Sequence, residues 1–425
     1  MRRSRGGLER RTAANSQAGV DAPRLGRARA LAYTSLGHFT NDGSVFLLPL
    51  VVDLLGSRYG TTHFEQSILL FFFYFSSMVS SVFVGRRADK TGASGRLMAV
   101  GMAFLGIGLI GFFVTMVYTA GTELFAFALL SDFVMGFGSA FYHPLGGSVL
   151  QASFERGNTG RALGLNGALG SVGRAVYPLI YGAAVLVVTI PDSMATFGLV
   201  GALAAILIWV GLGGIRTGRQ SDGHKGESLL RSLTRPMVIL MIITFVRSAA
   251  IFGVATYVQI FLTTQRGAGV GSLLGILTTV YFAPAIVGQP LFGWLMDRAD
   301  HRLVMALSGA GASASIIGFV SLGGVESYAF LSLFGFFAYT GFPVLLSLAA
   351  DYAPVGASNL GNSLVWGLGT TGGNALGPLI VYAFVLNDYS RLGASFEYMA
   401  ILALVSAIAA VLIPKPKMVA SVPER

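Results

Sequence analysis

The chain has 425 residues, of which 54% are hydrophobic and only 11% are charged, and its mean hydropathy is +0.70. A soluble globular domain carries about 25% charged residues, so this composition excludes a soluble protein and predicts an integral membrane protein. The formal net charge of +10 lies in short loops and tails, where membrane topology explains it better than a nucleic-acid partner does. Because the chain has no cysteine, disulfides and thiolate metal sites are excluded, and we expect no metal and no cofactor.

The first 26 residues are rich in arginine and contain no apolar run. A signal peptide needs an apolar segment directly after its basic start, and this segment is missing here. We therefore expect residues 1–26 to form a disordered basic tail on the cytoplasmic side, in contact with anionic lipid headgroups.

A membrane-spanning helix needs roughly 20 mostly apolar residues, and the chain contains twelve such segments. A more hydrophilic linker at 215–234 separates an N-terminal six-helix bundle at 27–214 from a C-terminal one at 235–413, and a short cytoplasmic tail follows at 414–425. The predicted spans are 27–54, 63–84, 97–118, 123–150, 160–189, 194–214, 235–263, 270–294, 302–323, 326–350, 360–387 and 394–413.

Lysine and arginine set the orientation of the spans, because cytoplasmic loops carry an excess of both residues. If the N-terminus is cytoplasmic, the external loops hold only Arg58, Arg266 and Arg391. The internal segments then hold Arg86, Arg87, Lys90, Arg96, Arg156, Arg161, Arg216, Arg219, Lys225, Arg231, Arg235, Arg298 and Arg302, besides both basic tails. This asymmetry predicts two cytoplasmic termini in a plasma membrane protein.

The two halves of the chain resemble each other at a separation of about 200 residues. Residues 173–180 match residues 373–380, since both segments begin with glycine and end in Pro-Leu-Ile, and His143-Pro144 in span four faces Phe342-Pro343 in span ten. Internal repeats of this length in a helical membrane protein are typical of two-bundle transporters. The repeat therefore predicts an all-α fold of two pseudo-symmetric six-helix bundles.

Two loops at equivalent positions share a motif. The loop after span two reads GRRADKTGASGR at 85–96, and the loop after span eight reads GWLMDRADHR at 293–302. With the six-plus-six layout, these loops resemble the signature of the major facilitator superfamily over nearly the whole chain. The residues that carry the motif are Gly85, Asp89, Gly92 and Arg96, with Gly293, Asp297 and Arg302 in the second copy, which lacks the later glycine.

A narrower resemblance concerns two short stretches. HFTND in span one and GFGSAFYHP in span four are similar to the fosmidomycin-resistance branch of exporters. The superfamily's usual arginine early in span four is not apparent, and Asp132 stands near its place. The resemblance therefore does not by itself imply the superfamily's standard form of proton coupling.

The motif loops have a physical role in this interpretation. Gly85 lets two helices approach closely, and Asp89 can accept hydrogen bonds from the N-terminus of a neighbouring helix and pair with a basic residue. Such a clasp would hold one conformation and release in the other. The alternative is a plain basic loop that only sets topology. Glycines at spacings of three and four in spans five and eleven predict smooth helix faces for mobile contacts between bundles.

All other charges lie in loops, tails or span ends, and six charged or imidazole side chains remain in the interior of the predicted spans: His38, Asp42, Asp132, His143, Arg174 and Arg247. At 1.5 Å per residue, four of them lie roughly 13–20 Å into the membrane, near its midplane. An unpaired charge at this depth costs at least about 3 kcal/mol, so such residues mark paths for ions or substrates. The resemblance adds that spans one, four, seven and ten line the central cavity.

These residues receive candidate roles. Arg247, Arg174, His38 and Asn41 are candidates for substrate binding, and Asp42, Asp132 and His38 for proton exchange. Structural alternatives stay open: Asp132 and Arg174 on consecutive spans could form a fixed ion pair, and His38 and Asn41 could bond neighbouring helices. The His143-Pro144 pair is interpreted as a helix bend with a local hydrogen bond.

The predicted function is a secondary active transporter that moves a small organic solute by alternating access with proton coupling. A drug/proton antiporter, an organic-anion symporter and a non-transporting membrane sensor are the alternatives. No phosphate-binding loop, zinc-protease motif or nucleophile elbow occurs in the sequence, so an enzyme is not expected. The expected partners are the lipid bilayer, a small-molecule substrate and protons, and the chain is expected to be a monomer.

Overall fold

The computed structural model describes residues 24–215, 217, 229–268, 272–354, 356–386 and 388–415. Within these residues all regular structure is helical. Residues 1–23, most of the predicted linker and the chain beyond 415 lie outside the described residues, and so does the predicted N-terminal tail apart from its last three residues.

The described residues of the N-terminal half form seven helices that supply six spans. They are α2 (Arg24–Tyr59), α3 (His63–Thr91), α4 (Ser94–Tyr118), α5 (Gly121–Ser139), α6 (Tyr142–Ser153), α7 (Arg156–Ala184) and α8 (Ile190–Leu212). Span four consists of α5 followed by α6, and the other spans are single helices.

The C-terminal half repeats this plan with more interruptions, after the one-turn helix α9 (Leu229–Ser232). Its spans are built from α10 (Arg235–Gln265), α11 (Ser272–Phe282), α12 (Pro284–Met296), α13 (His301–Ser321), α14 (Gly324–Ala338), α15 (Gly341–Tyr352), α16 (Ser358–Asn362), the π-helix η1 (Ser363–Thr371), α17 (Gly372–Val385), the 3₁₀ turn η2 (Tyr389–Arg391) and α18 (Leu392–Val411).

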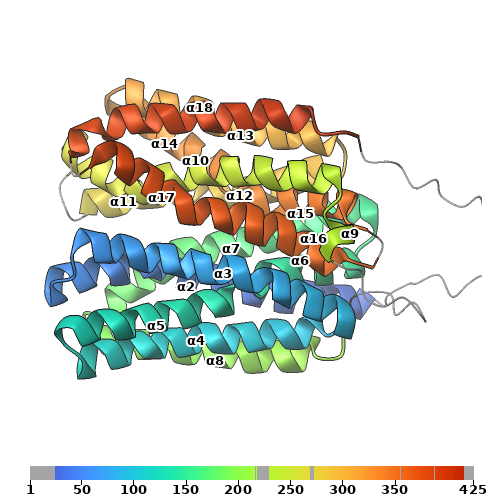
Figure 1. Cartoon of the computed structure of the whole chain (residues 1–425), viewed down its shortest axis with the longest axis horizontal. Helices are drawn as coiled ribbons and strands as arrows, with labels where there is room; N and C mark the ends of the chain where they lie inside the picture. The colour runs from blue at the N-terminus through green and yellow to red at the C-terminus, as the bar shows by residue number, and fades with distance from the viewer. Residues whose placement is uncertain are drawn as a thin grey trace, which may run out of the picture.

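The two halves lie side by side as separate bundles, and both ends of the chain leave at the same end of the molecule (Figure 1). We call that end the terminal face. Ten helices of the described residues are long and apolar enough to cross a membrane. Helix α7 and the α16–η1–α17 run lie among them and complete twelve spans. The predicted all-α fold of two six-helix bundles is confirmed.

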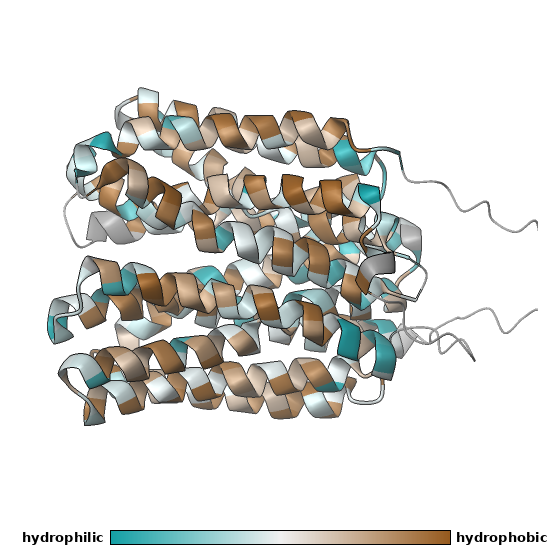
Figure 2. Ribbon diagram, viewed as in Figure 1, coloured by the Kyte–Doolittle hydropathy of each residue, from teal (hydrophilic) through white to brown (hydrophobic). Residues whose placement is uncertain are grey.

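Hydropathy follows this arrangement. Apolar residues cover the bodies of the helices, and hydrophilic residues gather at their ends (Figure 2). Large apolar side chains on the outer helices are exposed, including Phe83 on α3 and Leu203 on α8. In a bilayer such surfaces meet lipid, while the backbone polar groups are satisfied inside each helix.

Spans four and ten break at corresponding places, and proline explains both breaks. A proline ring clashes with the carbonyl group four residues earlier in a continuous helix. For Pro144 that residue is Ala140, directly after α5, and for Pro343 it is Tyr339, directly after α14. The stretches GFGSAFYHP and GFFAYTGFP can therefore be superimposed, which pairs His143 with Phe342.

Close helix contacts extend this correspondence to the first span of each bundle. A side chain at Gly173 on α7 would clash with Phe39 on α2, and one at Gly373 on α17 would clash with Phe245 on α10. A second pair of contacts, Gly43 with Tyr177 and Ala249 with Gly377, is related by the same shifts in residue number as the first pair.

Both pairs of contacts therefore relate α2 to α10 by a shift of 206 residues. This shift places Ser248 at the position of Asp42 and Arg247 at that of Asn41.

Candidate functional site

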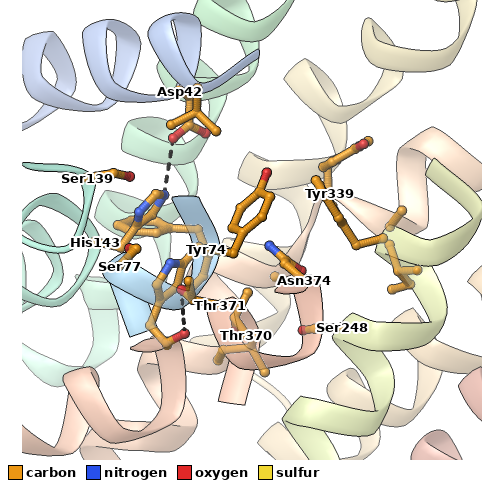
Figure 3. Close-up of a pocket in the computed structure, with 18 of the residues that line it drawn as sticks. Asp42, Tyr74, Ser77, Ser139, His143, Ser248, Tyr339, Thr370, Thr371 and Asn374 are labelled. Carbon is orange, nitrogen blue, oxygen red and sulfur yellow. Dashed lines mark hydrogen bonds and ion pairs between the residues drawn. The ribbon is translucent and has the colours of Figure 1, made fainter. Parts of the chain in front are cut away.

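A polar cavity lies between the two bundles. About 850 Å³ of space between atoms belongs to it, including solvent at its open mouth. The polar groups of the N-terminal bundle and those of the C-terminal bundle face each other across it, as Asp42 and His143 do with Ser248 and Asn374 (Figure 3). The cavity thus joins the bundles at the depth of the buried charges.

The carboxylate of Asp42 is the centre of one wall. Arg174 Nη1 lies 2.6 Å from its Oδ2 atom, and Asn41 Nδ2 donates to its Oδ1 atom over 3.1 Å. Two imidazoles approach from other directions: His38 Nε2 is 3.3 Å from Oδ2, and His143 Nε2 is 3.2 Å from Oδ1. Helices α2, α6 and α7 thus place four nitrogen-bearing side chains around one buried carboxylate.

His38 is held at both of its ring nitrogens. While Nε2 faces Asp42, Nδ1 lies 2.7 Å from Oδ1 of Asn166 on α7. Asn166 is itself fixed by Tyr142, whose hydroxyl lies 2.9 Å from the same oxygen, and by Thr34. His38 therefore lies between an amide oxygen and the Asp42 carboxylate, one at each ring nitrogen.

Arg174 pairs with Asp42 and not with Asp132, so the considered Asp132–Arg174 ion pair is wrong. The reason is direction: α7 turns the guanidinium toward α2 and the cavity, where Ser171 also accepts a hydrogen bond of 2.6 Å from Nη2. The guanidinium carbon lies 4.8 Å from the ring centre of Tyr339, across the gap between the bundles. Arg174 therefore connects the charged wall with the C-terminal bundle through a cation–π contact.

Asp132 lies away from the cavity. Its side chain is fully buried on α5, and both carboxylate oxygens lack a hydrogen-bond partner among the described residues. Neither Asp132 nor Asn41 lines the cavity. Asn41 reaches the site only through its bond to Asp42, and Asp132 is not brought to the cluster at all.

Arg247 lies on the opposite wall, on α10, and is 4% exposed. Its Nη2 atom donates to Ser308 Oγ over 2.7 Å and to the carbonyl oxygens of Phe337 and Ala338 over 3.3 and 3.4 Å. Its Nε atom has no partner, and no carboxylate of the described residues forms an ion pair with it. This guanidinium is anchored but not neutralised.

The sequence did not reveal His143 as a member of the site. The predicted bend at His143-Pro144 is present, but the imidazole contacts Asp42 and stacks on Trp366 of η1 with ring centres 4.3 Å apart. Asn166 and Tyr142 were also missed, because neutral polar residues in a membrane helix give no signal that separates a site from helix packing. The repeat that pairs His143 with Phe342 was the one available hint.

Three residues could offer ligand atoms to a metal ion. The ligand atoms of His38, Asp42 and His143 lie within 4.8 Å of one another. Arg174 already occupies Oδ2 of Asp42 at 2.6 Å, so a divalent cation would have to displace a guanidinium and then remain beside it. The donor set thus fits protons better than a dication.

The first motif loop connects the bundles at the terminal face. Asp89, near the end of α3, accepts hydrogen bonds from the backbone N–H groups of Asn359 and Leu360 over 3.1 and 2.8 Å. These groups begin α16 of the other bundle, and Asn359 adds a side-chain bond of 2.8 Å. The carboxylate thus caps the positive end of a helix across the bundle interface.

The second motif loop does the same in the opposite direction. Asp297, directly after α12, accepts hydrogen bonds from Gly160 N and Arg161 N at the start of α7, over 2.7 and 2.9 Å. Gly293 packs directly against Gly160 and Gly164. We call the contacts of Asp89 and Asp297 the two terminal-face latches. Among the described residues a basic partner occurs in the second latch alone, where Arg161 Nε is 4.0 Å from Asp297.

Gly85 packs against Asn359 and Ser363 of the other bundle, where a larger side chain would clash. The other motif residues stay within their own bundles. Gly92 caps α3 with a φ of 64°, and Arg96 donates to Gly213 at the end of α8. Arg302 pairs with Asp300 over 2.7 Å, and this hydrogen-bonded arginine lowers the pKa of Asp300 to about 2. Arg302 is therefore committed to a local pair and takes no part in a latch.

Side-chain amides close the terminal face further between the latches. Gln151 on α6 donates to the carbonyl oxygen of Leu346 on α15 over 2.9 Å. Asn362 on α16 donates to Ser148 Oγ on α6 over 2.9 Å. Together with the latches, these bonds join the bundles on the side of the cavity that faces the chain ends.

A polar cavity between two pseudo-symmetric helical bundles defines a membrane transporter of the two-bundle class. A family model described as Major Facilitator Superfamily matches residues 34–274 and 240–425. The chain belongs to the major facilitator superfamily, as the motif loops predicted.

Other comparisons agree on the fold. An uncharacterized MFS-type transporter, YfnC of Bacillus subtilis (strain 168), is 25% identical over 357 residues, which cover 81% of this chain and 84% of that protein. The E. coli fucose:proton symporter FucP gives a TM-score of 0.70 at 15% identity, with 92% of this chain and 99% of that chain covered. The human organic anion transporter MFSD10 gives the same score at 15% identity over 91% and 100%. The resemblance to fosmidomycin-resistance exporters stays a prediction.

Proposed function

We propose that this superfamily transporter is a secondary active transporter that moves a small organic solute by alternating access, in exchange or symport with protons. The observation that carries the proposal is the Asp42 cluster on the cavity wall. Its carboxylate, guanidinium and two imidazoles are buried together, and buried ionisable groups at membrane depth are typical of proton paths.

The cluster offers a definite place for a proton. His38 faces the oxygen atoms of Asn166 and Asp42 with its two nitrogens, so a proton can be exchanged between this imidazole and the carboxylate. Arrival or loss of a proton changes the charge beside Arg174 and the Asp42 carboxylate. A rearrangement of Arg174, which also contacts Tyr339 of the other bundle, would pass this change to the bundle interface.

Arg247 supports a solute with a negative group. Among the ionised side chains of the cavity, Asp42 offsets Arg174, so Arg247 leaves an excess charge of +1 when the histidines are neutral. A buried charge without a partner is costly, and a bound anion would compensate it. Organic-anion transport is therefore favoured over transport of cationic drugs, and among the structural neighbours one is named an organic anion transporter.

The latches support an alternating-access cycle. Both join the bundles at the terminal face, and the cavity lies beyond them. With the termini in the cytoplasm of a cell whose plasma membrane holds the protein, this conformation faces outward. Breaking the latches and rocking the bundles would open the cavity to the cytoplasm.

Purified protein in proteoliposomes tests this function. A pH-sensitive dye is trapped inside, and organic acids and their neutral amides are added outside. We expect at least one acid to change the internal pH with wild-type protein, and Asp42→Asn to abolish that change. Solute-dependent proton movement that persists in Asp42→Asn would contradict the assignment, and solute uptake without any proton movement would indicate uniport.

A further inference from the structure

The two halves of the cavity carry the same framework but different charges. In the N-terminal bundle, Asp42 on α2 lies against His143 in the first turn of α6 and against Arg174 on α7. The shift of 206 residues and the matching breaks place Ser248, Phe342 and Asn374 at these three positions in the C-terminal bundle. All three line the cavity. Ser248 and Asn374 lie across it from Asp42 (Figure 3), and Phe342 packs against His38 and His143. The C-terminal half has lost its carboxylate.

The guanidinium is not lost, because Arg247 stands at the position of Asn41. It is turned toward the break in span ten, where its Nη2 donates to the carbonyl oxygens of Phe337 and Ala338. Its Nε atom is buried without a partner. Its Nη1 atom lies 3.6 Å from the position that a Cβ atom would take at Gly341. Nη1 forms no hydrogen bond among the described residues, and it is therefore the nitrogen of this buried cation that is placed to bind a group in the cavity.

The break itself adds hydrogen-bond donors. In a continuous helix the N–H groups of Gly341 and Phe342 would donate to Phe337 and Ala338, four residues earlier. Those carbonyl oxygens accept from Arg247 instead, and no backbone bond in the described part of the chain joins them to Gly341 or Phe342. The first turn of the twelve-residue helix α15 thus presents unpaired N–H groups beside Arg247, an arrangement that favours an anion.

We infer that the substrate supplies the missing carboxylate: a monovalent organic anion binds with its charged group between Arg247, Ser248 and the first turn of α15, at the place that Asp42 occupies in the other half. Because the cavity holds one guanidinium more than carboxylates, we expect the bound solute to carry a single negative charge. The body of the anion lies against Phe252 and Trp366, which line the same cavity. This inference rests on the proposed transport function and names its substrate class.

The test asks whether an internal carboxylate can replace the ligand. The variant Ser248→Asp places a carboxylate at the symmetry-related position, and Ser248→Asn adds nearly the same bulk without a charge. Detergent-solubilised full-length protein is titrated with hexanoate, benzoate and 2-naphthoate, with the corresponding amides as neutral probes, at constant ionic strength. Binding is measured as the shift in melting temperature.

We expect at least one carboxylate to raise the melting temperature of wild-type protein clearly more than its amide. Arg247→Gln should weaken that carboxylate at least about tenfold, the loss expected for a buried charge-assisted hydrogen bond. Ser248→Asp should abolish binding and melt at or above the wild-type temperature without ligand, because its own carboxylate neutralises Arg247. Any loss of carboxylate binding in Ser248→Asn measures the effect of crowding. The difference in carboxylate binding between Ser248→Asp and Ser248→Asn measures the effect of the added charge.

Equal shifts with carboxylates and amides would overturn the inference, as would undiminished carboxylate binding in Ser248→Asp. Phthalate, a dianion, should bind more weakly than benzoate, and tighter binding of phthalate would contradict the single charge. These measurements do not involve protons. If carboxylates bind but no protons move, the proposed proton coupling is refuted and the carboxylate site stands. If protons move with solutes whose binding does not depend on their charge, the carboxylate site is refuted and the proton coupling stands.

Discussion

At the scale of single residues, the sequence predicted which charges are buried but not which of them meet. Span positions gave the depth of Asp42, Asp132, Arg174 and Arg247, because helix rise converts position into depth. The direction of each side chain around its helix axis depends on bundle packing, which a single sequence does not contain. The sequence therefore suggested Asp132, on the preceding span, as a partner for Arg174, whereas the structure places Arg174 2.6 Å from Asp42.

The Asp42–Arg174 pair should behave as a coupled unit. Loss of one member of a buried ion pair typically costs about 3–5 kcal/mol, because the other charge remains without compensation. We expect Arg174→Gln alone to destabilise the protein by about 3 kcal/mol and the double variant Asp42→Asn/Arg174→Gln to recover much of that loss. Thermal unfolding in detergent measures both, and strictly additive effects of the two substitutions would contradict a direct interaction.

Asp132 offers a matched comparison, since it is the other buried carboxylate of the N-terminal bundle. It lies off the cavity and has no hydrogen-bond partner among the described residues, which suits a neutral acid. We expect Asp132→Asn to change stability by less than about 1 kcal/mol and to preserve solute-dependent proton movement. If proteoliposomes with this variant lose proton movement while Asp42→Asn keeps it, the proton site belongs at Asp132.

At the scale of helices, the sequence predicted the twelve spans to within a few residues. It could not foresee how four of them are interrupted. Spans four and ten are broken, span eight divides before Pro284, and span eleven contains the π-helix Ser363–Thr371. Proline marks such breaks without showing whether a helix bends or opens. That choice depends on neighbours, as when Arg247 takes the carbonyl groups at the end of α14.

The latches should set the balance between the two open states. A carboxylate that caps a helix contributes about 1 kcal/mol, and its loss should shift a two-state equilibrium about fivefold. We therefore expect Asp297→Asn to populate the conformation that is open at the terminal face. A cysteine at Ser148, in the closed contact, should react with a maleimide several times faster in this background. An unchanged rate would show that the latch does not hold the closed state.

At the scale of the whole molecule, the repeat and the charge asymmetry of the loops predicted more than any single motif did. Both depend on sums over many residues, so an error at one position has little effect. The cavity was harder to predict, because it exists only where two bundles meet. Its walls combine residues as distant in sequence as Asp42 and Asn374.

The orientation can be tested directly because the chain has no cysteine. Lys90 lies at the terminal face, and Ser390 lies in the turn η2 before α18, at the opposite end. We expect a membrane-impermeant maleimide to label Ser390→Cys on intact cells and to label Lys90→Cys only after permeabilisation. The reverse pattern would place the chain ends outside the cell.

The two latches also have a mechanical consequence. Each bundle provides one aspartate and receives the other through a helix end, so two charged fastenings lie on either side of the pseudo-twofold axis, with the neutral amide bonds of Gln151 and Asn362 between them. Two such fastenings resist twisting as well as separation, whereas one alone would act as a pivot. Removal of a single aspartate should thus leave the bundles able to swivel about the remaining point. Variants at Asp89 and Asp297 would then open the molecule along two different, symmetry-related routes.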